Sequence, residues 1–280
     1  MPRRTIARAV DVRGIGLHTG ATVSLRLEPA LSGQGIVFER RDLSGRRRIP
    51  ARLESVAAVE RRTALRNGAH RVDTVEHLLA ALYATGVDDA TIAVEGPEIP
   101  ILDGSFAPFV ALADAAGLRG QPGPVNVARV DASLEVVEGD ARYLVESADA
   151  LSVRVSLEYA EPVIGQQTVI CEVTAESFRR EIQDARTFGF LGEVESLRAR
   201  GLLGGATAEC AIVLDETSVL TTTLRWPDEF ARHKLGDLIG DLALIGTRLI
   251  ARVQASRPSH RGNIACARAI ARAARFTEDA

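Results

Sequence analysis

Cysteine is scarce in this chain of 280 residues, which contains three, at positions 171, 210 and 266. They form no Cys-x-x-Cys pair, so the sequence predicts neither a disulfide framework nor a zinc site built from thiolates. Uncharged apolar runs also fall short of the roughly 18–20 residues that a membrane-spanning helix needs. The first residues are charged and no apolar stretch follows them, so we expect no secretion signal. These absences favour a cytoplasmic protein without a transmembrane segment.

An excess of charge of one sign is also missing. The formal net charge is −3, whereas nucleic-acid-binding domains are usually basic, so we expect no nucleic-acid partner. With 46% hydrophobic and 25% charged residues, the composition is that of a folded chain and excludes a disordered one. Lysine is nearly absent, because the 34 basic residues include one lysine, Lys234. A bias of this kind usually reflects genome composition, which leaves the position of the one retained lysine as the informative feature.

The clearest break in the chain is residues 119–126 (RGQPGPVN), which hold two prolines and two glycines. Such a segment cannot continue a helix or a central strand, so we predict two domains, residues 1–122 and 127–280. Strands are predicted at 22–28 and 151–158 from alternating polarity, and a buried strand at 210–214. Helices are predicted at residues 73–86, 105–116, 175–185, 193–200, 230–252 and 264–275. Strands followed by helices in each half indicate α+β domains, although no internal repeat is visible in the sequence.

The first candidate for chemistry is Glu76 beside His77, near the start of the first predicted helix. If Asp73 is the N-cap, Glu76 stands at the third helical position and completes a capping box, and the residues alone favour this structural role. The alternative is a metal-binding histidine next to a carboxylate general base, a pairing that metallohydrolases use.

The second candidate is His233 with Asp237, four residues apart on one helical face that Asp241 continues. On spacing alone, a plain amphipathic helix with its polar face in water is favoured. Two glycines inside this helix, Gly236 and Gly240, argue the other way. Each costs about 1 kcal/mol relative to alanine, and the close approach of another backbone or of a substrate would offset that cost.

The remaining histidines give weaker signals. His260 lies in a predicted loop rich in turn residues, where catalytic groups are common. His18 stands in a glycine-rich run that precedes a strand, so the run is not a dinucleotide fingerprint, and His70 is expected to be exposed. His77, His233 and Asp237 would together supply the ligands of a Zn²⁺ or Fe²⁺ site. Periodicity cannot show that residue 77 meets residue 233, so a metallohydrolase remains one hypothesis at this point.

Six segments, taken in order, resemble a known family. They are residues 14–20 (GIGLHTG), 74–78 (TVEHL), 97–105 (PEIPILDGS), 185–190 (ARTFGF), 232–242 (RHKLGDLIGDL) and 260–263 (HRGN). In these segments the chain resembles the zinc-dependent UDP-3-O-acyl-N-acetylglucosamine deacetylases of lipid A synthesis. The resemblance implies two α+β domains of similar topology, each with a mainly antiparallel sheet. It places the helices between the two sheets and the active site at the domain interface. It also implies that residues 186–215 form a strand–helix–strand insert at an acyl-chain passage.

The same resemblance implies the chemistry of the site. His77, His233 and Asp237 would bind one Zn²⁺, with Fe²⁺ as the alternative metal. Glu76 would be the general base in hydrolysis of the N-acetyl group of UDP-3-O-(3-hydroxyacyl)-N-acetylglucosamine, giving the free amine and acetate. A protonated His260 would stabilise the oxyanion or donate a proton to the leaving amine.

Four further residues take supporting roles by resemblance. Asp241 would orient His260, and Thr187 would stabilise the oxyanion. Lys234 would contact the nucleotide diphosphate, and Phe188 would pack on the substrate.

Arg61 and Arg62 depart from the more apolar stretch expected beside the acyl passage, so the preferred chain length stays open. The alternative function is a metal-dependent amidase acting on a different N-acetylated sugar. Under either function, the expected partner is a small-molecule substrate, and we expect the protein to be a monomer.

Overall fold

The computed structural model describes residues 2–45 and 48–279, and two five-stranded sheets form its frame. The strand order of the first sheet is β2 (Val10–Ile15), β3 (Thr22–Pro29), β9 (Ala90–Glu95), β4 (Ile36–Arg40) and β5 (Arg48–Pro50). The order of the second is β12 (Leu134–Glu138), β13 (Ala141–Glu146), β19 (Arg252–Ser256), β14 (Ser152–Glu158) and β15 (Gln166–Glu172). In each sheet one pair of strands is parallel, β4 with β9 and β14 with β19, and the other pairs are antiparallel. The expected similarity in topology is therefore confirmed, although no sequence repeat indicates it.

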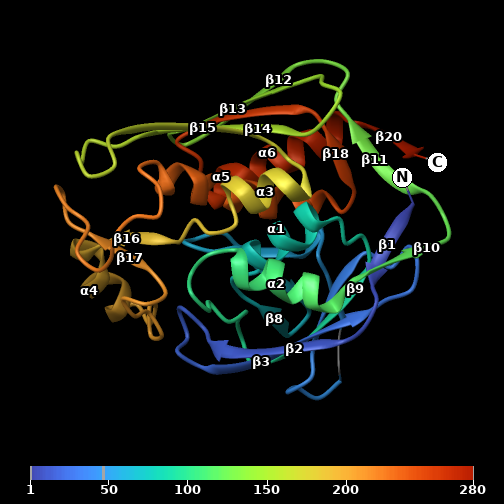
Figure 1. Ribbon diagram of the computed structural model, residues 1–280, viewed down its shortest axis with the longest axis horizontal. Coiled ribbons are helices and arrows are strands. Elements are labelled where there is room, and N and C mark those ends of the chain that lie inside the picture. The colour runs from blue at the N-terminus through green and yellow to red at the C-terminus, as the bar shows by residue number, and fades with distance from the viewer. Residues whose placement is uncertain (1, 46–47, 280) are drawn as a thin grey trace.

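Apart from the helix at Leu191–Ala199, the helices lie in a layer between the two sheets, as expected (Figure 1). The α-helices of the described residues are α1 (Glu76–Thr85), α2 (Ala107–Ala116), α3 (Ala175–Glu181), α4 (Leu191–Ala199), α5 (Glu229–Leu242) and α6 (His260–Ala273). Helix α1 packs against α2 and α5, and α5 packs against α6. Within the described residues, no helix has both the length and the apolar character needed to cross a bilayer.

The apolar core follows from the alternation in the strands. In β3, Val23 and Leu25 are buried between more exposed neighbours, and Val153 and Val155 repeat the pattern in β14. The inward side chains of both sheets join those of the helices in one continuous buried cluster. Burial of such side chains stabilises the fold by about 1.5–3 kcal/mol each.

The boundaries predicted for the last two helices are wrong. The helix predicted at 230–252 ends at Leu242, because a short 3₁₀ turn (Ala243–Ile245) stops at Gly246, whose φ is 77°. The chain then forms β18 (Arg248–Ile250) and β19. The helix predicted at 264–275 begins four residues earlier, at His260, because the Ser259 side chain accepts a hydrogen bond from the Gly262 N–H and caps it.

Smaller sheets surround the frame. Strand β10 (Leu118–Gln121) pairs with β1 (Arg3–Ile6), so the predicted chain break is narrower than residues 119–126. Strand β11 (Val125–Arg129) follows it and lies between β18 and β20 (Arg275–Asp279). The domain limits at 122 and 127 stay a prediction. The third small sheet contains β6 (Val56–Ala58), β7 (Ala64–Asn67) and β8 (His70–Val72).

The predicted strand–helix–strand segment is present. Strand β16 (Phe188–Phe190) leads into α4, and β17 (Ile212–Leu214) returns to pair with β16 in parallel. The predicted strand at 210–214 is therefore confirmed at its last three residues. The helix predicted at 175–185 is likewise shorter, because α3 ends at Glu181.

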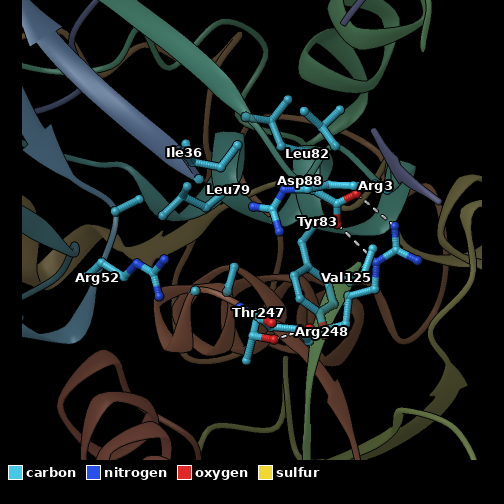
Figure 2. Close-up of a pocket in the computed structure, with 17 residues that line it drawn as sticks. Arg3, Ile36, Arg52, Leu79, Leu82, Tyr83, Asp88, Val125, Thr247 and Arg248 are labelled. Atoms are coloured by element: carbon cyan, nitrogen blue, oxygen red, sulfur yellow. Dashed lines mark hydrogen bonds and ion pairs between the residues drawn. The ribbon is translucent and has the colours of Figure 1, made fainter. Parts of the chain in front are cut away.

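Polar contacts join the two halves of the chain at the C-terminal end of α1. A cavity of about 60 Å³ lies there, lined by residues of both halves (Figure 2). Arg248 pairs with Asp88 at 3.0 Å, and the Leu249 N–H donates to the Tyr83 hydroxyl at 2.8 Å. The halves are thus held together by hydrogen bonds as well as by the shared core.

Candidate active site

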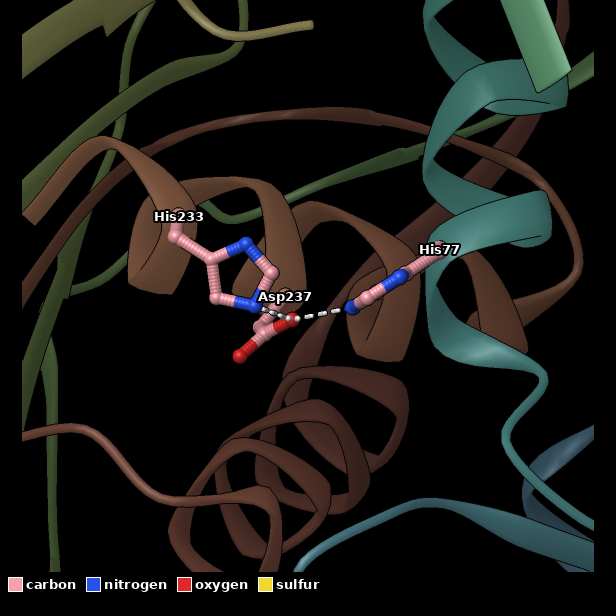
Figure 3. A group of neighbouring side chains, drawn as sticks. All are labelled: His77, His233 and Asp237. Carbon is pink, nitrogen blue, oxygen red and sulfur yellow. Dashed lines mark ion pairs between the residues drawn. The ribbon is translucent and has the colours of Figure 1, made fainter. Parts of the chain in front are cut away.

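Three candidate ligands meet between the N-terminal end of α1 and the middle of α5. Figure 3 shows His77 of α1 pointing toward His233 and Asp237 of α5. The Nε2 atoms of both histidines lie 3.4 Å from Asp237 Oδ1. One ligand atom from each residue falls within 4.8 Å of the others, and all three residues are buried. The contact that periodicity cannot establish is therefore present.

The two glycines of α5 explain how the helices come close enough. A Cβ atom at Gly240 would overlap the backbone carbonyl of Glu76, and one at Gly236 would overlap the Phe106 ring. One of the two expectations for these glycines is the close approach of another backbone, and this expectation is confirmed at Gly240. It allows α1 and α5 to approach each other until His77 reaches the α5 ligands.

The protonation states suit a divalent cation. The His233 Nδ1–H donates to the Ala185 carbonyl at 3.0 Å, which leaves Nε2 as the free donor atom. Burial lowers the pKa of His233 to about 3, so the ring is neutral. Although burial opposes ionisation of Asp237, the charge of the neighbouring Lys234 ammonium helps to hold its pKa well below the usual value.

One ligand oxygen is also left without a hydrogen bond. Asp237 Oδ1 is buried and has no hydrogen-bond donor among the described residues. Two imidazoles and this carboxylate oxygen are a donor set that fits one divalent metal ion.

The capping role that the residues alone favour for Glu76 is wrong. The N-cap of α1 is Val75, without a side-chain cap. Asp73 instead pairs with Arg62 at 2.9 Å and with Arg71 at 2.5 Å. The Glu76 carboxylate is buried, and this burial raises its pKa. Glu76 is therefore free for a role in the site.

His260 approaches the same group of side chains from α6. Its Nε2 lies 3.8 Å from Glu76 Oε1 and 3.9 Å from Asp237 Oδ2. Its Nδ1–H donates to Asp241 Oδ2 at 2.9 Å. Burial opposes protonation of His260, but the Asp241 charge outweighs it, and the pKa rises to about 9. The expectation that His260 lies in a loop is wrong, because it is the first residue of α6. The expectation that the polar side of α5 faces solvent is also wrong, because His233, Asp237 and Asp241 are at most 2% exposed.

A cavity of about 890 Å³ opens beside these residues and is lined by Lys234, Phe188, Tyr159 and His260. Lys234 Nζ donates to Asp237 Oδ2 at 2.9 Å and lies 5.8 Å from the centre of the Phe188 ring. A substrate in this cavity would therefore meet the ammonium group and the aromatic ring together.

Thr187 stands immediately before Phe188. Its N–H donates to the Gly104 carbonyl at 2.9 Å, and its hydroxyl makes no hydrogen bond to any described residue. Two residues earlier, the Ala185 carbonyl accepts from His233 Nδ1, whereas the Thr187 side chain makes no hydrogen bond to the three candidate ligands among the described residues.

The other candidate residues lie outside the metal cluster. His70 is 7% exposed in β8, so the expectation that it is exposed is wrong. His18 is also buried, and its backbone N–H donates to Glu98. Arg62 is directed to Asp73, and Arg61 pairs with Glu193 of α4 at 2.6 Å.

Sequence reasoning misses Thr63 and Asn263, which both donate hydrogen bonds to Asp241. Asn263 lies in one of the matched segments, so its position is a usable signal. Thr63 is a threonine in a connection between two short strands, and nothing in the sequence pattern distinguishes it.

A three-residue metal site with a carboxylate and an imidazole beside it, facing a cavity, is the arrangement of a metal-dependent hydrolase. Comparison with known proteins narrows this class. The model of one family, LpxC: UDP-3-O-acyl N-acetylglycosamine deacetylase, matches residues 3–272. The chain belongs to this family.

Individual relatives agree with the family match. The UDP-3-O-acyl-N-acetylglucosamine deacetylase of Myxococcus xanthus is 42% identical over 92% of this chain and 82% of its own length. The protein of the same name from Anaeromyxobacter dehalogenans is 43% identical over 93% of this chain and 84% of its own. The protein of the same name from Phenylobacterium zucineum is 41% identical over 97% of this chain and 94% of its own length.

Proposed function

We propose that this protein hydrolyses the N-acetyl group of UDP-3-O-(3-hydroxyacyl)-N-acetylglucosamine, releasing acetate and the free amine for lipid A synthesis. The observation that carries the proposal is the convergence of His77 from α1 with His233 and Asp237 from α5, flanked by Glu76 and His260. The names of the relatives support the substrate.

The same proposal includes the metal ion, the cellular location and the oligomeric state of the enzyme. Zn²⁺ is the metal that best suits two imidazoles and one carboxylate, with Fe²⁺ as the alternative. Held there, it would act as a Lewis acid toward the attacking water and the amide carbonyl. We take the active form to be a cytoplasmic monomer of two domains, residues 1–122 and 127–280, with the site between them.

Glu76 would accept the proton of the attacking water. Its Oε2 is held by the Thr63 N–H at 3.0 Å, which fixes the orientation of the carboxylate. Burial raises its pKa toward the range in which a carboxylate accepts a proton readily.

His260 would donate the proton that the leaving amine requires. The hydrogen bond to Asp241 keeps the ring protonated and directs Nε2 toward Glu76 and Asp237. With Nδ1 held in this way, Nε2 is the atom that faces the reacting groups.

Three residues would position the substrate and the developing charge. The free hydroxyl of Thr187 would donate to the oxyanion, as preorganised donors do in acyl-transfer sites. Phe188 would pack against the substrate, and the Lys234 ammonium would attract the diphosphate.

Replacing Glu76 by glutamine tests the proposal. Glu76→Gln should retain the metal but lose kcat by about 10²–10⁴-fold, the usual contribution of a general base. The measurement is acetate release from the UDP-linked acylated sugar, with metal analysis of the same sample. Glu95→Gln, at an exposed position of β9, is the matched control and should keep the wild-type rate.

Near-normal turnover by Glu76→Gln would rule out its role as base. If the wild type were equally active on the UDP-sugar with and without its acyl chain, the proposed substrate would be wrong. That result would favour an amidase acting on another N-acetylated sugar.

A further inference from the structure

Thr63 uses every one of its polar groups at the candidate site. It lies between β6 and β7 and is fully buried. Its N–H donates to Glu76 Oε2 at 3.0 Å, and its carbonyl accepts from the Val75 N–H at 3.2 Å. Its hydroxyl donates to Asp241 Oδ1 at 2.5 Å. One residue thus contacts both the proposed base and the carboxylate behind the proposed acid.

The hydroxyl contact has a specific consequence for the Asp241 carboxylate. Oδ2 already accepts from His260 Nδ1 and from Asn263 Nδ2, both at 2.9 Å. Oδ1 accepts from Thr63, whose Oγ1 also lies 3.4 Å from His260 Nδ1. With both oxygens engaged, the carboxylate has one orientation, and that orientation sets the direction of the His260 ring.

The backbone contact fixes the other half of the site. The Thr63 N–H holds Glu76 Oε2, while the Thr63 carbonyl binds the N–H at the start of α1, the helix that carries Glu76 and His77. The backbone and hydroxyl groups belong to one rigid residue with a β-branched side chain. Movement of Glu76 relative to Asp241 would therefore break one of these bonds.

We propose that Thr63 is a positioning residue that holds Glu76 and the Asp241–His260 pair in register for proton transfer. This inference rests on the proposed hydrolase function. Small displacements of catalytic groups are costly, since a misplacement of about 1 Å can reduce a rate on the order of 10²-fold.

The test compares Thr63→Val with Thr63→Ser. Valine keeps the shape and the backbone N–H but removes the hydroxyl, whereas serine keeps the hydroxyl. Thr63→Val should bind metal as the wild type does and lose kcat on the order of 10²-fold with little change in KM. Thr63→Ser should recover most of kcat.

Thr85→Val is the matched control. Thr85 is also a buried threonine, but its hydroxyl donates to the Ala81 carbonyl at the far end of α1. This variant should keep the wild-type kcat even if its melting temperature falls.

A second measurement separates positioning from mere stabilisation. If Thr63 acts through Asp241, the losses of kcat in Thr63→Val and Asp241→Asn should not multiply in the double variant, because both disrupt one unit. Fully multiplicative losses, or a wild-type kcat in Thr63→Val, would overturn the inference. An inactive wild type in the same assay would instead contradict the proposed function itself.

Discussion

At the scale of single residues, the chemistry of the site depends on which buried groups hold protons. His233 is neutral because burial disfavours its charged form, whereas His260, equally enclosed, is kept protonated by Asp241. The two imidazoles therefore suit different tasks, one as a metal ligand and the other as a proton donor. The Asp241 carboxylate, which is hydrogen-bonded to His260, accounts for the difference between the two rings.

Removing the Asp241 charge should move the pH profile. Activity requires protonated His260 and so falls as the pH rises through its pKa. Asp241 raises that pKa, so Asp241→Asn should lower it and shift the alkaline limb of kcat to lower pH. The measurement is kcat against pH for both proteins, and an unmoved alkaline limb would contradict the assignment of His260.

The one lysine of the chain is suited to its position. Lys234 Nζ donates to Asp237 Oδ2 and lies 5.8 Å from the centre of the Phe188 ring. A planar guanidinium would not fit this contact as a compact ammonium does, so Lys234→Arg should lower kcat/KM by about tenfold. Full catalytic efficiency in this variant would mean that the lone lysine is an accident of composition.

Some residues of the candidate site can be predicted from the sequence and others cannot. The three candidate ligands, with Glu76 and His260 beside them, can be proposed from the sequence, mostly through the family resemblance. The capping box is a wrong prediction because Asp73 forms ion pairs with two arginines instead of capping the helix. No local sequence pattern indicates these ion pairs. Thr63 cannot be found from the sequence, since its partners are 13 and 178 residues away.

At the scale of elements, helix α5 determines the site. Its start and its polar face are predictable from periodicity, but not the fact that the polar face is covered, because the helix lies between two sheets with neighbours around it. Its end is mispredicted because the apolar residues after Leu242 suit a helix or a strand equally well. The two interior glycines are the correct signal of a close contact.

Gly240→Ala should therefore destabilise the protein, although alanine is the better helix former. The added methyl would overlap the Glu76 backbone and force α1 and α5 apart, at a cost of about 1–3 kcal/mol in the free energy of unfolding. Urea unfolding measures this loss, and metal content should fall with it. Gly192→Ala in α4, where a Cβ meets nothing, is the matched control. Wild-type stability in Gly240→Ala would contradict the packing account.

At the scale of the whole molecule, the two halves repeat one arrangement of strands and helices, and each contributes a helix to the candidate metal site. Helix α1 precedes the central strand β9 of the first sheet, as α5 precedes β19 of the second. The sequence does not reveal this likeness, because many different residues satisfy the same alternation of buried and exposed positions. The family resemblance indicates it instead, and the site between the halves follows from the contact of α1 with α5.

The central claim is that ligands from both halves bind one metal and that this centre hydrolyses the acylated UDP-sugar. The most direct measurement is metal content and acetate release on the same preparations of the wild type and His77→Ala, with circular dichroism to verify folding. The wild type should contain about one equivalent of divalent metal and release acetate. His77→Ala, which removes the single ligand from the first half, should lose both while remaining folded. A wild type without stoichiometric metal, or a His77→Ala protein that keeps its metal and its turnover, would contradict the account.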